Sequence, residues 1–390
     1  MNLLGVLIAF VEWYDTAVTI AFSHAIYYSF FPNFQKELAF KTELLLITCS
    51  CLGKPIGAYL IGKFSDNYDR LQAAKVSFFL MIFCSFFIVF LPSFQSIGYF
   101  SLFLFFIIKF IQGIAVGGNY ATSVYSIEQS NQKFFISSLT SFSIFCGFFL
   151  ANTFHSFFYR FDQSFYNLFA WRVAYFFTII FSLPIFWLIN KESSLKKVIN
   201  YEENKIYNNE TFEFFRTCFL VLLDVIPFQY FHVFLPNYKR LILQYNETLI
   251  QKGIFTTLLT INIITPFVGK IADKFGPMFF LKSSALMMIF SFFIFHYIFE
   301  NFAKFFIADI YFGVMMAFCY GTLYCYLPMN FCKNSRARLS GFALNFTTSI
   351  VLILMPVFSN SIEKYILHIL LFIGTFSFAL LSIKDKSNVF

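Results

Sequence analysis

Long apolar stretches alternate with short polar ones along the whole chain. A stretch of about 18 residues or more is long enough to cross a hydrocarbon core of about 30 Å as a helix. We count twelve such stretches, and the longest polar segment, 190–213, divides them into two sets of six. The pattern predicts an all-α polytopic membrane protein with spans at 3–31, 42–62, 73–92, 97–127, 134–158, 170–190, 215–236, 249–271, 278–299, 303–328, 339–360 and 365–383.

The first span contains two acidic residues, Glu12 and Asp15. A carboxylate near the centre of a bilayer costs roughly 2.5–3.5 kcal/mol on insertion scales, so two in one helix need a water-filled cavity or cationic partners. Their i, i+3 spacing places them on one helix face. We therefore interpret this helix as the lining of an ion or solute path, with a structural ion pair as the alternative interpretation.

Composition agrees with a membrane protein. The chain is 59% hydrophobic and only 12% charged, with a mean hydropathy of +0.71. Its net charge of +8 does not indicate nucleic-acid binding, because the basic residues lie in short loops rather than on one soluble surface. If both termini are cytoplasmic, 17 of the 28 Lys and Arg fall on that side and nine on the other. This bias predicts cytoplasmic termini.

A repeated loop supports two related halves. GKFSDNYDR (62–70) follows the second span and GKIADKFGP (269–277) follows the eighth, with Gly62 and Asp66 matching Gly269 and Asp273. We interpret this match as an internal duplication. It predicts one six-helix bundle at 1–190, a cytoplasmic linker at 191–214 and a second bundle at 215–390.

The repeated turn has a physical rationale. Glycine lets two helices approach closely. An aspartate at a helix terminus accepts backbone N–H groups or pairs with a cation of a neighbouring loop. We expect Asp66 and Asp273 to hold the cytoplasmic face in one conformation, the alternative being solvated loop acids.

Six strings together resemble the major facilitator superfamily, and within it the metabolite:proton symporter group of proline/betaine, α-ketoglutarate, citrate and shikimate transporters. In chain order they are VEWYDTAV (11–18), GKPIGAYLIGKFSDNYDR (53–70), KFIQGIAVGGNYATSVYSIEQS (109–130), WRVAYF (171–176), FLPNY (234–238) and LPMNFCKNSRARLSGFALNF (327–346). The resemblance implies two six-helix bundles related by an axis along the membrane normal. It also implies a transporter that moves a small polar metabolite across a bacterial inner membrane by alternating access, coupled to protons.

Four positions depart from the family pattern. Lys54 replaces an arginine, which keeps the charge and loses the bidentate fork. Asp69 stands where glycine is expected, and Pro277 where the second copy has arginine. Asn119 replaces the glutamate of a Gly-Gly-Glu string, and an amide takes up no proton at physiological pH.

The candidate coupling groups are Glu12 or Asp15 opposing Lys109, which lies near the middle of the fourth span. Lys54 and Asp224 are further intramembrane charges. For Arg172, at the outer end of the sixth span, we weigh bracing of the outer gate, capture of an anionic solute, and an interfacial position.

At the inner end of the fourth span, Glu128 matches a family acid. We expect it to pair with Arg70 or another loop cation.

Two questions stay open at this level. The first question is the substrate. Glu12, Asp15 and Asp224 suit the ammonium of a zwitterion, whereas Lys54, Lys109 and Arg172 suit an organic carboxylate. Asn119 also leaves a proton-independent facilitator as an alternative, and the altered loops leave a non-transporting sensor.

We find no phosphate loop, metal-ligand spacing or Ser/His/Asp elbow in the sequence, so we expect no enzyme activity, cofactor or metal. We expect a monomer in the bilayer.

Overall fold

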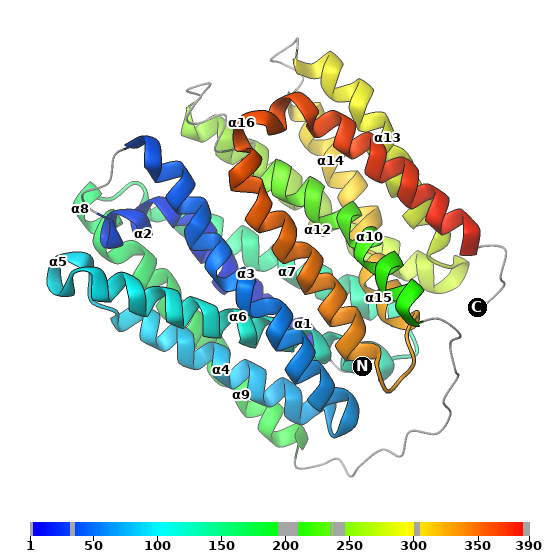
Figure 1. The fold of residues 1–390 in the computed structure, drawn as a ribbon, viewed down its shortest axis with the longest axis horizontal. Helices are drawn as coiled ribbons and strands as arrows, with labels where there is room; N and C mark the ends of the chain where they lie inside the picture. The colour runs from blue at the N-terminus through cyan, green and yellow to red at the C-terminus, as the bar shows by residue number, and fades with distance from the viewer. Residues whose placement is uncertain are drawn as a thin grey trace.

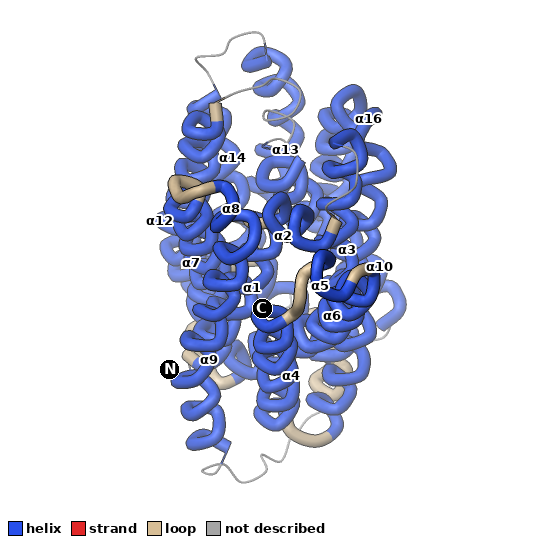
Figure 2. The backbone as a smooth tube through the Cα atoms, turned by 90° about the vertical axis from the view of Figure 1, so that its left-hand side faces the viewer, coloured by secondary structure: helices blue, strands red, loops and turns tan. Residues whose placement is uncertain are grey.

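The structure is a computed structural model that describes residues 3–31, 36–193, 210–234, 236, 246–299 and 305–384. Helices account for nearly all of this part of the chain, and it contains no strand (Figure 2). The predicted all-helical fold is confirmed. The predicted linker 191–214 lies mostly outside the described residues, and the proposed bundle boundaries stay predictions.

The N-terminal half comprises α1 (Leu4–Ala21), α2 (Ser23–Phe30), α3 (Lys36–Asn67), α4 (Arg70–Phe90), α5 (Phe94–Ile97), α6 (Tyr99–Glu128), α7 (Lys133–Phe158), α8 (Gln163–Phe165), the π-helix η1 (Tyr166–Ala170) and α9 (Trp171–Ser193). The C-terminal half comprises α10 (Glu210–Phe228), the π-helix η2 (Gln229–Phe234), α12 (Glu247–Phe275), α13 (Met278–Phe299), α14 (Phe305–Tyr320), α15 (Leu323–Met329) and α16 (Arg336–Lys384). The two halves lie side by side (Figure 1).

Among the described residues, eight helices are long and apolar enough to cross a membrane, and two shorter apolar helices accompany them. Several predicted spans are interrupted. The first is split into α1 and α2 at Phe22, and the tenth into α14 and α15 after Tyr320. The last two predicted spans form one 49-residue helix, α16, which turns back on itself (Figure 1).

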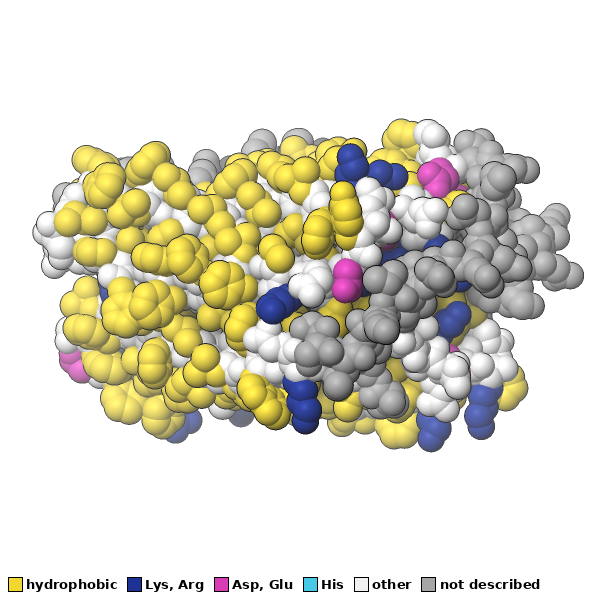
Figure 3. Space-filling model, turned by 90° about the horizontal axis from the view of Figure 1, so that it is seen from below, with side chains coloured by type: hydrophobic (Ala, Val, Ile, Leu, Met, Phe, Trp, Pro, Cys, Tyr) yellow, Lys and Arg dark blue, Asp and Glu magenta, His cyan; other side chains and the backbone are white. Residues whose placement is uncertain are grey.

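The outer surface is apolar, as a lipid-facing surface requires. Along α4, Phe79, Phe83 and Phe90 are each about half exposed or more. Figure 3 shows one face on which hydrophobic side chains dominate and Lys and Arg gather toward one end. Exposed phenylalanines of this kind are expected on a surface that contacts lipid.

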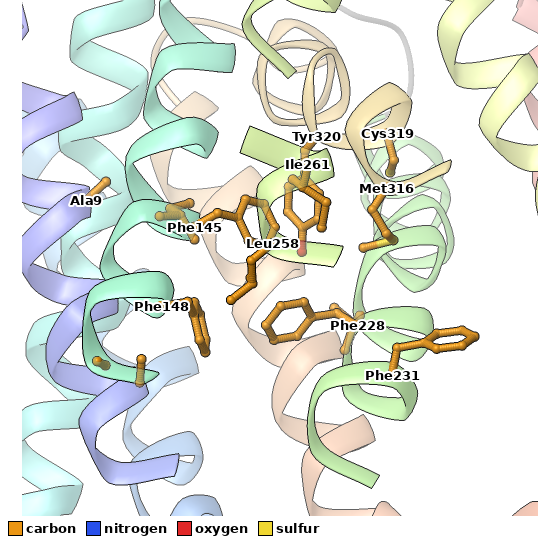
Figure 4. Packing of buried hydrophobic residues seen from close by; sticks show 14 of the residues in the cluster. Ala9, Phe145, Phe148, Phe228, Phe231, Leu258, Ile261, Met316, Cys319 and Tyr320 are labelled. Carbon is orange, nitrogen blue, oxygen red and sulfur yellow. The ribbon is translucent and has the colours of Figure 1, made fainter. Parts of the chain in front are cut away.

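The halves meet along two helix pairs, α3 with α16 and α7 with α12. Aromatic rings fill part of this interface (Figure 4). The Phe145 ring lies edge-on to Tyr320 with centroids 4.6 Å apart, and Phe148 lies edge-on to Phe228 at 5.3 Å. Because α7 supplies one ring of each pair, the contact is directly between the halves.

Within the N-terminal half, α3 and α6 pack backbone to backbone. A Cβ atom added at Gly57 would lie 1.9 Å from the Ile114 carbonyl oxygen, and one added at Gly113 would lie 1.9 Å from the Ser50 carbonyl oxygen. Only glycine permits this approach. It brings Lys54, on α3, beside the buried face of α6.

We predict that Gly57→Val lowers the thermal unfolding midpoint of the purified protein, because overpacking costs about 1–3 kcal/mol. Ile56→Val is the matched control, since Ile56 is 42% exposed on the same helix. An unchanged midpoint for Gly57→Val, measured by tryptophan fluorescence, would contradict this packing.

Candidate functional site

Asp15 and Lys109 belong to one buried network in the N-terminal half. They are 1% and 2% exposed. The Asp15 carboxylate accepts from the Ser85 hydroxyl at 2.7 Å and from the Gln112 side-chain amide at 2.5 Å. Gln112 in turn accepts from Lys109 Nζ at 2.7 Å. The predicted opposition of acid and ammonium is therefore indirect, with Gln112 between them.

Lys109 is fully satisfied within this network. Besides Gln112, its ammonium donates to the Thr19 hydroxyl at 2.8 Å and to the Tyr175 hydroxyl at 2.7 Å. An ammonium has three donors, and all three are used. Sequence reasoning missed Gln112, Thr19 and Tyr175, although Gln112 stands in the quoted KFIQG string, one turn after Lys109.

A small cavity of about 20 Å³ adjoins this network, lined in part by Asp15, Lys54, Lys109 and Gln112. A volume of this order holds one water molecule among polar partners. The cavity can thus hold a water molecule next to Asp15 and Lys109.

A larger cavity of about 80 Å³ lies between the two halves. It has room for several water molecules or one small solute. The N-terminal half contributes Glu12, Trp13 and Lys54 to its wall, and the C-terminal half contributes Asp224 and Tyr324. Neutral polar groups complete the wall: Tyr120, Ser123, Ser137, Thr140, Ser141, Gln229, Tyr320, Asn345 and Thr348.

Three of the predicted residues thus meet at this central cavity. Glu12, 8% exposed, lies close enough to Lys54 and to the Asn119 side chain to interact electrostatically with both. Asp224, 3% exposed, accepts from the Tyr324 hydroxyl at 2.6 Å. Lys54 lines both cavities.

Asn119 lies one layer behind the cavity wall. Its side-chain oxygen accepts from the Ser77 hydroxyl at 2.6 Å. Its side-chain nitrogen faces the Met81 sulfur at 3.9 Å.

Arg172 is placed at neither cavity. Its guanidinium donates to the Leu91 carbonyl at 2.9 Å and to the Leu168 carbonyl, and it stacks 4.1 Å from the Trp171 ring. Because Leu91 ends α4, Arg172 joins α4 to α9. These contacts lie within the N-terminal half, and the three interpretations of Arg172 stay predictions.

The two repeated turns perform the same task in opposite halves. Asp66, at the end of α3, accepts from the backbone N–H groups of Ala337 and Arg338 at 3.1 and 2.8 Å. Those groups begin α16, in the other half.

Asp273, at the end of α12, accepts from the N–H groups of Phe134 and Phe135, both at 2.9 Å. Those groups begin α7, again in the other half. Each carboxylate therefore caps a helix N-terminus across the interface, where a negative charge is favoured. We call the end of the bundle that contains both caps the repeat end.

The paired glycines make the caps possible. A Cβ atom at Gly62 would lie 2.8 Å from the Arg338 Cα, and one at Gly269 would lie 2.1 Å from the Ser138 hydroxyl oxygen. A larger residue at either position would hold the carboxylate away from its helix.

Charged side chains reinforce the Asp66 cap. Arg70 contacts Asp66 at 3.5 Å and Glu128 at 3.1 Å, as expected for Glu128. Glu128 also pairs with Arg336 at 2.9 Å, and Arg70 donates to the Lys333 carbonyl at 3.1 Å. At the second cap Pro277 occupies the place of Arg70, and proline supplies no charge. The two caps are therefore equivalent in backbone contacts and unequal in side-chain contacts.

The fold and the two caps define a polytopic helical membrane protein of two related halves around a central polar cavity. The chain belongs to the Major Facilitator Superfamily, whose family model matches residues 16–356.

Relatives and solved structures agree with this assignment. The chain is 23% identical to the proline/betaine transporter of Escherichia coli K12 over 302 residues, covering 71% of this chain and 60% of that protein. It is 31% identical to the α-ketoglutarate permease of the same strain over 113 residues, covering 29% and 26%. The proton:xylose symporter XylE, bound to 6-bromo-6-deoxy-D-glucose, superposes with a TM-score of 0.79 at 16% identity, covering 98% of this chain and 94% of that one.

We predict that Asp66→Ala speeds hydrogen exchange at the amides of residues 337 and 338 by about fivefold, because loss of a cap costs about 1 kcal/mol. Asp273→Ala is expected to act in the same way on residues 134 and 135.

Each variant is the control for the other, since each leaves the second cap intact. Mass-spectrometric exchange in detergent tests both. Equal acceleration at the two sites in either variant, or at neither, would contradict the assignment of separate caps.

Proposed function

We propose that the protein is a secondary transporter that moves a small polar metabolite by alternating access between its two halves. The observation that carries this proposal is a central cavity lined by charged groups from both halves, together with two caps that join the halves at the repeat end. Buried charges that face no cavity would indicate a static bundle. Caps that cross the interface hold the halves together and break when the halves rock apart.

The relatives support the same class of activity. Their names describe transport of proline and betaine, of shikimate and of α-ketoglutarate. The chain spans about 60% of the length of the proline/betaine transporter. We therefore take the class of activity from the relatives and leave their particular substrates aside.

The protein is a multi-pass bacterial membrane protein of a transporter family, and we infer that it acts in the inner membrane as a monomer. We place the termini and the repeat end in the cytoplasm, because the basic loop residues gather on that side. In this orientation the structure corresponds to a carrier closed toward the cytoplasm.

Proton coupling would use Asp15 and Glu12. Protonation of Asp15 removes the charge that the Gln112 amide and Ser85 stabilise, and so weakens its link to Lys109. Glu12 faces the central cavity directly. A proton and a solute would thus act on neighbouring groups of the same half.

A proton-independent facilitator is the second candidate, because Asn119 replaces a family acid. The structure gives less support to a non-transporting sensor. Asp69, at one altered loop position, caps α4 by accepting from the Leu71 N–H at 2.7 Å. Asp273 keeps its cap despite Pro277.

We predict saturable counterflow of labelled solute in proteoliposomes, and accumulation only when a pH gradient is present. Asp15→Asn should abolish accumulation and retain counterflow, since the variant loses the proton site and keeps the cavity.

Asp162→Asn is the control, because Asp162 is an exposed loop acid outside both cavities. Accumulation that survives collapse of the gradient would favour the facilitator. No counterflow of any solute in a panel of amino acids, betaines and di- or tricarboxylates would count against transport.

A further inference from the structure

Lys54 differs from every other buried charge of the central cavity. It is 6% exposed, yet its ammonium has no hydrogen bond or ion pair with any part of the chain that the structure describes. Glu12 acts on it through space without forming an ion pair, and the Trp13 ring lies 5.7 Å away. A buried ammonium without an acceptor is costly. Lys109, one helix away, has three acceptors.

The opposite wall offers a partner for a cation. Asp224 accepts a hydrogen bond from Tyr324, and a carboxylate has room for further donors. The Tyr324 and Tyr320 rings stack beside it, with centroids 5.6 Å apart and planes 8° from parallel. Aromatic faces next to a carboxylate suit an ammonium group, including a quaternary one.

The sum of charges distinguishes the two substrate classes that the sequence leaves open. The cavity wall has one cation, Lys54, and two acids, Glu12 and Asp224. A dicarboxylate would meet one ammonium and two carboxylates. A simple cation would leave Lys54 without an acceptor. A molecule with one carboxylate and one ammonium satisfies both walls.

We propose that the central cavity binds a small zwitterion, with its carboxylate on Lys54 and its ammonium group between Asp224 and the Tyr320–Tyr324 pair. The proposal rests on the transport function above and specifies its substrate class. The cavity of about 80 Å³ limits the ligand to a small molecule.

The same placement gives the ligand a mechanical role. Lys54 lies on α3 in the N-terminal half, and Asp224 lies on α10 in the C-terminal half. A zwitterion whose carboxylate binds Lys54 and whose ammonium group binds Asp224 would therefore contact both halves at once. A ligand with a single charge engages one half only.

Calorimetric titration of the purified full chain tests the proposal with three probes: glycine betaine, choline and succinate. Choline has the quaternary ammonium without the carboxylate, and succinate has two carboxylates without the ammonium. We expect glycine betaine to bind at least about tenfold more tightly than either, since each charge-assisted contact is worth at least about that factor.

Lys54→Gln and Asp224→Asn should each weaken glycine betaine binding by about tenfold or more. Lys54→Gln should leave choline binding unchanged, which a general loss of folding would not do. Lys63→Gln is the matched control, because Lys63 is exposed on the same helix. Asp162→Asn is the control for the acid.

Binding of succinate in preference to glycine betaine, or unchanged glycine betaine binding in Lys54→Gln, would overturn the proposal. The two hypotheses fail separately. Betaine binding that depends on Lys54 without counterflow refutes transport and supports the zwitterion site. Betaine counterflow that Lys54→Gln leaves intact refutes the site and supports transport.

Discussion

A charge inside a membrane helix needs compensation, and this requirement organises the N-terminal half. Asp15 is compensated by Ser85 and Gln112, and Lys109 by Gln112 and two hydroxyl groups. Lys54 lies next to this network and has no such partner among the residues that the structure describes. The N-terminal half therefore contains two kinds of charge. Asp15 and Lys109 are hydrogen-bonded and suited to carry a proton, whereas Lys54 faces the central cavity, where the proposed solute would supply its acceptor.

At the repeat end, carboxylates are also compensated, here by helix N-termini of the opposite half. A carboxylate on the first N–H groups of a helix is stabilised by the helix dipole, and separation of the two loses that stabilisation. Asp66 and Asp273 use this interaction across the interface in opposite directions. Arg70, Glu128 and Arg336 strengthen one cap, whereas Pro277 leaves the other with backbone contacts alone. At the repeat end, these short polar contacts therefore add to the apolar packing of α3 against α16 and of α7 against α12.

The sequence predicted what depends on local pattern and missed what depends on distance in the chain. Hydropathy placed the spans, and the repeated turns identified Asp66 and Asp273, because both signals are local. The helices that those carboxylates cap lie in the other half, and no spacing in the sequence reveals them. Gln112 was missed because an amide in an apolar helix gives no charge signal. The sequence left three roles open for Arg172 because its charge alone does not tell which carbonyl groups it contacts.

The central claim is that the halves move apart at the repeat end once the caps are lost. Double electron–electron resonance measures the distance between spin labels at Tyr68 and Phe275 in a cysteine-free protein in lipid nanodiscs. These two residues lie beside the two caps and are 75% and 80% exposed. We expect that removal of both caps, in Asp66→Ala with Asp273→Ala, shifts the distance distribution to a longer, second population. A distribution that is identical with and without the caps would contradict it.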